Sequence, residues 1–452
     1  MPQNEMLRTA PIGKLLLKFS LPAIVGMLVN ALYNVVDRMY IGWIGPLAMT
    51  GIGLSLPLMT LIMGFGMLVG IGSGSRISIR LGQDRKDDAE HILGNAFTLL
   101  FLIMSAVMIL GLTFKEPLLY LFGASEATIG YADDYLTIIL MGAIFQGIGF
   151  GLTGVIRSEG NPKIAMYTVL IGAILNIVLD PIFIFVFDLG IKGAAIATIF
   201  SQFVSMMLVF RHFTIGKSRL KLHTKNLKLN FEIVISILSI GMSPFFMQVA
   251  ASLVTVITNN ALKSTGGDIA IGAMTVINAI VIFFMMPIFG INQGTQPIIG
   301  YNYGAKEYGR VKQALKLAII AGTTISTTGF LLTQFFTEPL IRIFNSDPEL
   351  VSVATKGMHI FLGVLPVIGF QIISANYFQA VGKAPKAIFL SLLRQVIVLI
   401  PLLFILPKLF GLTGVWFAGP IADLTASIVT ALFLIREIRH LDEHAKIKPT
   451  ST

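Results

Sequence analysis

The sequence predicts an all-α polytopic membrane protein, with twelve transmembrane helices in two six-helix bundles related by a pseudo-twofold axis. Three observations lead to this prediction. The chain of 452 residues is 55% hydrophobic and only 12% charged. It contains about a dozen mostly uncharged runs, each long enough to cross a bilayer core of roughly 30 Å as a helix. Its two halves are also similar to each other in sequence.

The apolar runs define the spans in order. The first follows Lys14 and Lys18 and continues for about 20 residues without a small-residue cleavage site, so we expect a retained helix rather than a signal peptide. The predicted spans cover residues 15–40, 50–75, 91–113, 134–156, 163–187, 192–212, 233–260, 270–298, 313–336, 351–377, 386–406 and 413–435.

The distribution of basic residues predicts the orientation of these spans. With both termini in the cytoplasm, the inner loops and tails hold 25 of the 33 lysines and arginines, the outer loops hold six, and Arg38 and Arg394 fall within spans. Cytoplasmic loops of membrane proteins carry an excess of Lys and Arg. We therefore expect cytoplasmic termini, and we expect the net charge of +10 to face the bilayer surface rather than a nucleic acid.

The most basic inner segment divides the chain. RHFTIGKSRLKLHTKNLKLN (211–230) has six lysines or arginines and no acid. We predict a cytoplasmic linker at residues 216–231, between an amino-terminal lobe at 1–215 and a carboxy-terminal lobe at 232–437, with a cytoplasmic tail at 438–452. Such a linker is typical of a segment that sets topology; a grip on anionic lipid is the alternative.

A shift of 222 residues brings the two halves into register. EPLLYLF (116–122) falls on EPLIRIF (338–344), and the same shift places Gly72 on Gly294. One offset that holds over about 140 residues indicates a duplicated six-helix unit. Because six is an even number, both copies enter the membrane from the same side, as in transporters that alternate access between two bundles. We expect the binding cavity to lie between the halves.

Several chemistries find no support in the sequence. The chain has no cysteine, which excludes a disulfide, a thiolate metal site and a Cys nucleophile. It has no GxxxxGK[ST] phosphate loop, so we do not expect ATP as the energy source. His440 and His444 have the spacing of one helix face, but a solvated face is the expected explanation on a charged tail. We expect no enzymatic activity, no cofactor and no resident metal.

Three carboxylates lie well inside predicted spans: Asp37, Asp180 and Asp423. An ionisable residue in a span costs about 2.5 to 3.5 kcal/mol on insertion scales, so each is a candidate functional residue. Counted at about 1.5 Å per residue from the inner anchors Lys18 and Lys163, Asp37 and Asp180 both lie roughly 26 to 28 Å along their helices. We therefore expect these two acids at one level in the outer part of the bilayer.

Polar neighbours accompany this expected pair. Tyr33 precedes Asp37 by four residues, Asn176 precedes Asp180 by four, and Thr198 reaches a similar depth in the sixth span. A spacing of four residues places side chains on one helix face. The cluster offers hard oxygen ligands, which either coordinate a small hard cation such as Na⁺ or hold a proton on a carboxyl group. Oxygen chemistry leaves H⁺ and Na⁺ both open.

Pro181 directly follows Asp180. Inside a helix, proline removes its own hydrogen bond and clashes with the preceding turn, so the carbonyl of Ile177 loses its usual partner and the span bends. We expect this bend beside a titratable group to respond to its charge. Adaptation of helix packing is the alternative.

The duplication provides an internal comparison for the two acids. Under the same offset, Asp37 corresponds to Asn259, and Asp180 falls on residue 402 or 403, both leucine. An acid pair that served the shared fold would be expected in both copies, so the asymmetry favours a coupling-ion site confined to the first half. The alternative is an ion pair with an arginine of the spans, either Arg38 or Arg394.

Other polar side chains are candidates for lining the cavity. Hydrogen bonding between helices is the alternative role for them. These candidates are Asn30, Asn34, Gln248, Asn292, Gln371, Asn376 and Asp423.

Four motifs together are similar to those of a known family. They resemble the multidrug and toxic compound extrusion (MATE) family over essentially the whole chain, in particular its bacterial MepA-like and DinF-like members. The motifs are LPAIVGMLVNALYNVVDRMYIG (21–42), GVIRSEGNPKIAMYTVLIGAILNIVLDPIFIF (154–185), GIKGAAIATIFSQ (190–202) and GTQPIIGYNYGAK (294–306).

The resemblance implies twelve helices in two lobes, a large central cavity and efflux of varied, often cationic drugs in exchange for protons or sodium. By position, Tyr33 and Asp37 match the polar residues of the first helix in this family. Asn176 and Asp180 match the fifth-helix pair, and Thr198 matches the sixth-helix hydroxyl of an amino-terminal cation site. Another branch has acids in helices 7 and 10; this chain has none there, so that second type of cation site is not expected.

These observations lead to one hypothesis and one rival. We expect a monomeric, multi-pass, secondary-active drug exporter of a bacterial cytoplasmic membrane. Cation binding at Asp37 and Asp180 would favour one arrangement of the protein while drug binds the other. The rival is a flippase for a lipid-linked saccharide or other amphipathic lipid, which predicts several basic residues in the cavity; Arg38 and Arg394 are the only candidates. The coupling ion and the substrates stay open.

Overall fold

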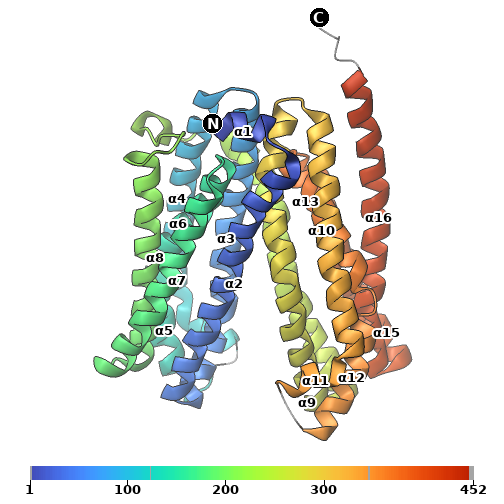
Figure 1. The fold of residues 1–452 in the computed structure, drawn as a ribbon. Coiled ribbons are helices and arrows are strands. Elements are labelled where there is room, and N and C mark those ends of the chain that lie inside the picture. The colour runs from blue at the N-terminus through green and yellow to red at the C-terminus, as the bar shows by residue number, and fades with distance from the viewer. Residues whose placement is uncertain (1–2, 123, 345–346, 447–452) are drawn as a thin grey trace, which may run out of the picture. The chain divides into compact units, whose positions relative to one another are not determined.

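The computed structural model describes residues 3–122, 124–344 and 347–446, and this part of the chain is almost entirely helical. Most of the long α-helices are connected by short turns, whereas residues 215–230 form a longer connection between α8 and α9 (Figure 1). The elements are α1 (Gln3–Thr9), α2 (Ile12–Ile44), α3 (Pro46–Gly82), α4 (Lys86–Leu121), α5 (Ile129–Met141), α6 (Ala143–Ser158), α7 (Pro162–Pro181), the π-helix η1 (Ile182–Val186), α8 (Gly190–Thr214), the 3-10 helix η2 (Thr224–Leu227), α9 (Phe231–Gly304), α10 (Tyr308–Phe335), α11 (Thr337–Arg342), α12 (Pro348–Phe361), α13 (Leu365–Ala380), α14 (Ala384–Leu392), the π-helix η3 (Leu393–Leu399), α15 (Ile400–Phe410) and α16 (Leu412–Lys446).

The predicted spans correspond to these helices. Within the described residues, ten helices are long and apolar enough to cross a membrane, and two bent helix pairs raise the number to twelve if each pair is one span. Predicted spans 7 and 8 both lie within α9, which consists of two helices, Phe231–Gly267 and Ile269–Gly304, separated by a kink where Gly267 adopts a φ of 65°. A positive φ is easily adopted by glycine, which has no Cβ. The all-α, twelve-span prediction is thus confirmed.

Two spans differ from the straight helices that the sequence predicts. Predicted spans 134–156 and 351–377 are each built from two helices that meet at 53°, α5 with α6 and α12 with α13. Gly142 joins the first pair, and a Cβ there would lie 2.3 Å from a methyl carbon of Ile199. Pro366 lies in the first turn of α13, where its missing N–H is tolerated. Tight packing and proline chemistry therefore account for these two breaks.

By compactness, the described chain falls into two units. One unit comprises Met1–Ile24 and Phe246–Thr452, and the other comprises Val25–Phe245. The boundaries lie inside α2 and inside α9, so each of these helices contributes to both units. The lobes predicted from the repeat, at 1–215 and 232–437, are defined by sequence similarity instead of compactness.

In the Val25–Phe245 unit, α3 packs on α4, α5 and α6, and α8 packs on α5, α6 and α7. The first part of α9 crosses α3 at two glycines. A Cβ on Gly241 would lie 1.6 Å from the carbonyl oxygen of Leu68, and a Cβ on Gly72 would lie 2.1 Å from that of Ile237. Backbones approach this closely only where no side chain intervenes.

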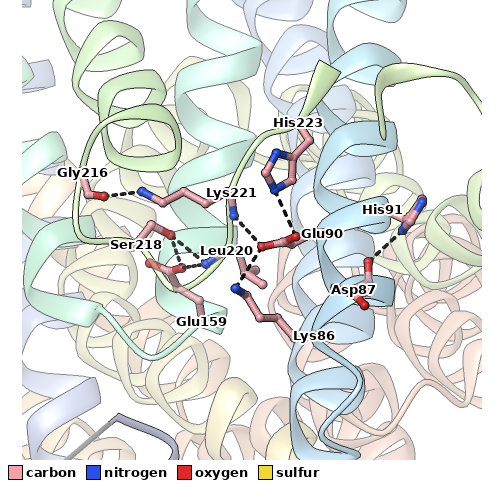
Figure 2. Close-up of polar contacts among 10 residues, drawn as sticks. All are labelled: Lys86, Asp87, Glu90, His91, Glu159, Gly216, Ser218, Leu220, Lys221 and His223. Atoms are coloured by element: carbon pink, nitrogen blue, oxygen red, sulfur yellow. Dashed lines mark hydrogen bonds and ion pairs between the residues drawn. The ribbon is translucent and has the colours of Figure 1, made fainter. Parts of the chain in front are cut away.

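The segment between α8 and α9, residues 215–230, is folded onto the ends of α4 and α6, and we call it the strap. Two buried glutamates hold it (Figure 2). Glu159 accepts hydrogen bonds from the Ser218 hydroxyl, at 2.5 Å, and from the Leu220 amide, at 3.5 Å. Glu90 accepts one from the Lys221 amide, at 3.0 Å. The predicted linker is therefore an ordered element in this region.

The second half of the strap is held by α4. Asn95 donates to the carbonyl oxygens of Asn226 and Lys228, both at 3.3 Å, and accepts from the amide of Asn230 at 2.7 Å. Thr98 donates to the Leu227 carbonyl at 2.8 Å. These side chains satisfy backbone groups that the irregular strap cannot satisfy internally.

In the other unit, α13 packs on α10 and α16, and α15 packs on α16. Two buried carboxylates of α16 are paired with bases. Asp423 accepts a hydrogen bond from the Arg394 guanidinium, and Glu437 pairs with Lys383 and with Lys386, the latter at 3.1 Å. Such pairing is the usual way to accommodate a carboxylate inside a membrane protein.

Candidate functional site

The two acids expected at one level lie close together in the structure. Asp37 lies on α2, and Asp180 is the penultimate residue of α7. Both side chains belong to the Val25–Phe245 unit, and they are 9% and 0% exposed. Their carboxyl groups interact with each other directly. The structure thus joins two residues that are 143 positions apart in sequence.

An amide and a hydroxyl complete this cluster. The Asn176 side-chain nitrogen donates to one oxygen of Asp180 at 3.2 Å and to the Thr198 hydroxyl at 3.3 Å. Asn176 and Thr198 are 2% and 5% exposed. Asn176 therefore bridges α7 and α8 and orients the carboxyl group of Asp180.

Three oxygens of the cluster have no hydrogen-bond donor among the described residues. They belong to Asp37, Asp180 and Asn176, and all three are buried. An unsatisfied buried acceptor is costly, and two neighbouring carboxylates repel each other when both are ionised. A proton or a hard cation among these oxygens would remove both penalties. The donor set therefore fits either coupling ion.

Neither acid is neutralised by an arginine. Within the described residues, no salt bridge includes Asp37 or Asp180, whereas Arg394 is paired with Asp423. Arg38 is exposed, as its neighbouring position on the helix predicts. The charge of Arg38 acts on Asp37 at a distance, but no ion pair forms at this cluster within the described residues.

Two tyrosines border the acids. Tyr33, which the sequence identifies, and Tyr135 of α5, which it does not, both interact electrostatically with Asp37 and Asp180. Tyr135 is 2% exposed. A phenol beside a carboxylate can donate a hydrogen bond. We therefore add Tyr135 to the candidate site.

An apolar layer separates the acids from one end of the unit. Ile41, Ile184 and Ala194 belong to one buried cluster. Each lies four residues from a site residue, and these site residues are Asp37, Asp180 and Thr198, respectively. Residues four apart lie on the same helix face, so all three segments contribute to a single layer. The layer excludes water from this side of the cluster.

Pro181 coincides with a change of helix type. It is the last residue of α7, and the chain continues as the π-helix η1 without a sharp break. Single π-helical turns occur frequently at functional sites. The structure thus shows a π-helical segment directly after Asp180 and Pro181, and a bend that responds to the charge of Asp180 stays a prediction.

The remaining candidates lie outside this cluster. Asn34 donates to the backbone and side-chain oxygens of Asn30, at 2.7 and 3.2 Å, and both residues are exposed. Asp423 is engaged by Arg394. A role in lining a cavity stays a prediction for these three residues and for four others that are buried or partly buried: Gln248, Asn292, Gln371 and Asn376.

Comparison with known proteins is consistent with this architecture. The MatE family model matches residues 22–182 and 244–405, two segments whose first residues are 222 positions apart. This spacing equals the offset found within the sequence. Multidrug export protein MepA of Staphylococcus saprophyticus is 30% identical over 437 residues, which cover 96% of each chain.

Solved structures agree over nearly the whole length. The structure of the MATE multidrug transporter DinF-BH, solved as a complex, is 41% identical, with a TM-score of 0.87, and the match covers 94% of this chain and 95% of that one. An outward-facing multidrug resistance MATE family transporter of the MOP superfamily is 25% identical, with a TM-score of 0.92 and coverage of 98% and 99%.

Proposed function

The chain belongs to the MatE family of membrane transporters, and we propose that it exports lipophilic, often cationic drugs and toxic compounds in exchange for protons or sodium ions. The relatives named above are multidrug transporters, which supports this substrate class. One observation carries the coupling proposal: the buried pair of Asp37 and Asp180 has acceptor oxygens without donors and no basic partner among the described residues.

Coupling follows from the charge of this pair. With no cation bound, the two carboxylates repel each other in a water-poor environment, and the cluster is under strain that separation of α2 from α7 would relieve. A bound proton or Na⁺ removes the repulsion and favours their close approach. Because a ligand shifts an equilibrium only by its differential affinity for the two states, drug must bind better to the other arrangement.

Amide substitution tests this proposal. Asp37→Asn and Asp180→Asn keep the volume of the side chain but remove its charge. In proteoliposomes, we expect each variant to bind a fluorescent cationic dye but to lose export against a gradient. The control is Asp134→Asn, which removes an exposed carboxylate that pairs with Lys192 at 3.2 Å in the same unit. Wild-type uphill export by both site variants would refute the proposal.

The coupling ion requires separate gradients. If a single ion is coupled to export, vesicles with only a proton gradient and vesicles with only a sodium gradient should export the dye at different rates. If vesicles without either gradient export the dye as fast as vesicles with one, export is not coupled to a cation gradient.

We also propose that the protein is a monomer in a bacterial cytoplasmic membrane, with both termini in the cytoplasm and no nucleic-acid partner. The loop charges support this orientation. Because the chain has no cysteine, a single introduced one reports its own location. In intact cells, a membrane-impermeant thiol reagent should label Asp134→Cys but not Lys217→Cys. The opposite labelling pattern would indicate the inverse topology.

The flippase rival gains no support. It requires several free basic groups in the cavity, and one of its two candidates, Arg394, is neutralised by Asp423.

A further inference from the structure

The strap, residues 215–230, has an inner face that is fully engaged with the protein. Glu90 and Glu159, which hold it, are 6% and 0% exposed and lie beneath it. His212 and His223 contact these two glutamates (Figure 2 shows His223). These two acids are therefore turned inward and anchor the strap, and Glu232, two residues after it, is the exposed acid nearest to its end in sequence.

The outer face of this region is basic. Arg211, in the last turn of α8, and Lys217, Lys225 and Lys228 of the strap are all exposed. None of the four forms a salt bridge within the described part of the chain, and residues 211–230 contain no acid. Since the strap is pinned by its backbone, these cations are held in place instead of being spread over a flexible loop.

Large apolar side chains flank the cations. Ile215, the first residue of the strap, and Phe231, which directly follows the strap as the first residue of α9, are 83% and 78% exposed. Full exposure of such side chains to water is unfavourable relative to burial, in proportion to the apolar area that water covers. A surface that combines exposed cations with exposed apolar anchors is typical of a segment at the boundary between headgroups and acyl chains.

The neighbouring helix places the strap at that boundary. An exposed apolar stripe runs along α8 through Phe200, Phe203, Met207 and Phe210, and it ends beside Arg211. Residues at this spacing share one helix face. The stripe has the character of a lipid-facing surface, so Arg211 and the strap that follows lie where that surface ends.

We propose that the strap, together with Arg211, is a binding site for anionic phospholipid. Lys217, Lys225 and Lys228 contact the phosphate headgroups, and Ile215 and Phe231 insert among the first acyl carbons. Both the charge of the strap and its depth at the membrane surface match an anionic lipid. Anionic leaflets attract basic segments next to a span, and each lysine near the surface raises the affinity roughly fivefold. This site is independent of the export proposed above.

The primary test measures lipid binding by the full-length protein. Fluorescent phosphatidylglycerol is titrated into purified protein in non-ionic detergent, with fluorescent phosphatidylcholine as the zwitterionic comparison. We expect the protein to bind the anionic lipid more tightly than the zwitterionic one. The triple variant Lys217→Gln/Lys225→Gln/Lys228→Gln should bind the anionic lipid about tenfold to a hundredfold more weakly than the wild type. Exposed lysines do not hold the fold, so the thermal midpoint in detergent should not change.

The matched control removes the same charge elsewhere. Lys14→Gln/Lys316→Gln/Arg436→Gln neutralises three exposed residues of the other unit. Binding that falls equally in both triple variants, or in neither, would overturn the proposal, because it would make lipid affinity a property of net charge or of other residues.

Two further measurements separate the lipid from its headgroup. Glycerol 3-phosphate should not displace the labelled lipid at equal concentration, because it lacks acyl chains. Ile215→Ser/Phe231→Ser should weaken phosphatidylglycerol binding while leaving its salt dependence unchanged. Displacement by the free headgroup, or full affinity of the serine variant, would contradict membrane insertion and indicate a simple phosphate site.

Discussion

Gly241→Ala is the most direct test of how the Val25–Phe245 unit is packed. In the structure, a Cβ at this position of α9 would lie 1.6 Å from the Leu68 oxygen, 2.5 Å from its carbonyl carbon and 2.9 Å from its Cα. These atoms are backbone of α3 and cannot rotate away. Ordinary contact begins at 3.4 Å, so the two helices would have to separate by about 1.8 Å at this crossing.

The free energy of this change has two opposing parts. Overpacking a well-packed crossing costs about 1 to 3 kcal/mol or more. Alanine in place of glycine within a helix returns up to about 1 kcal/mol. Because the added Cβ would lie 1.6 Å from a backbone oxygen, the cost of overpacking lies in the upper part of its range, about 2 to 3 kcal/mol. The expected net loss is then about 1 to 2 kcal/mol, which lowers a thermal midpoint by roughly 2 to 8 °C for a unit of this size.

The assay is thermal unfolding in detergent, followed by size-exclusion chromatography with fluorescence detection. The control is Gly53→Ala on α3, where an added Cβ meets nothing within 4 Å. This variant should unfold at the wild-type temperature or slightly above it. A midpoint for Gly241→Ala that equals or exceeds that of Gly53→Ala would refute the close approach of α9 and α3.

Three other predictions concern polar contacts. Arg394→Met leaves Asp423 buried and unpaired, so it should destabilise the protein by about 3 to 5 kcal/mol. Asp423→Asn should cost less, because the amide oxygen of asparagine can still accept a hydrogen bond from the Arg394 guanidinium. Equal losses in a thermal scan would contradict this order. Glu159→Ala should release the strap from the end of α6. Amide hydrogen exchange should then become faster at residues 218–230 and stay unchanged in α4. Unchanged exchange in the strap would show that α4 alone holds it. Asp347→Ala removes the side chain that accepts hydrogen bonds from the Glu349 and Leu350 amides, at 3.0 and 2.9 Å. The loss of this helix cap should lower the free energy of unfolding by about 1 kcal/mol. Amide hydrogen exchange should become faster only in the first turn of α12, and unchanged exchange there would argue against the cap.

The spans were predictable because their signal is local. A run of about twenty apolar residues is visible in one stretch of chain at a time. The repeat was predictable for a similar reason, since a single offset relates EPLLYLF to EPLIRIF. The positions of Asp37 and Asp180 needed one further step, a count of helical rise, which worked because α2 and α7 are each unbroken up to the acid.

The same count fails for Tyr135. Along a straight helix it would lie about 33 Å from Arg157, beyond the level of the acids. The 53° bend between α5 and α6 shortens that distance across the membrane and brings Tyr135 to the acids. At that bend, Gly142 packs closely against Ile199 of α8, which is a contact between segments distant in sequence. No local pattern at residues 129–158 reports it.

The basic linker shows a second limit. Its composition indicates a cytoplasmic segment but not a folded one. The strap is ordered because Glu90 and Asn95 of α4 and Glu159 after α6 provide partners for its backbone amides and carbonyls. These three residues lie at span ends, where a polar side chain is usual and attracts no notice. Their shared role becomes visible only when the segments are brought together.

By itself, the sequence determined which segments of this protein are built to cross a membrane, that the unit is duplicated and which acids lie inside it. These properties follow from the cost of placing polar groups in lipid, and that cost is set residue by residue. Only the tertiary structure decided which of the acids are paired. Asp423 meets Arg394, whereas Asp37 and Asp180 meet each other and leave oxygens without donors. Partner choice depends on the contacts between helices, because a carboxylate has the same local sequence signal whether its neighbour is a base or another acid.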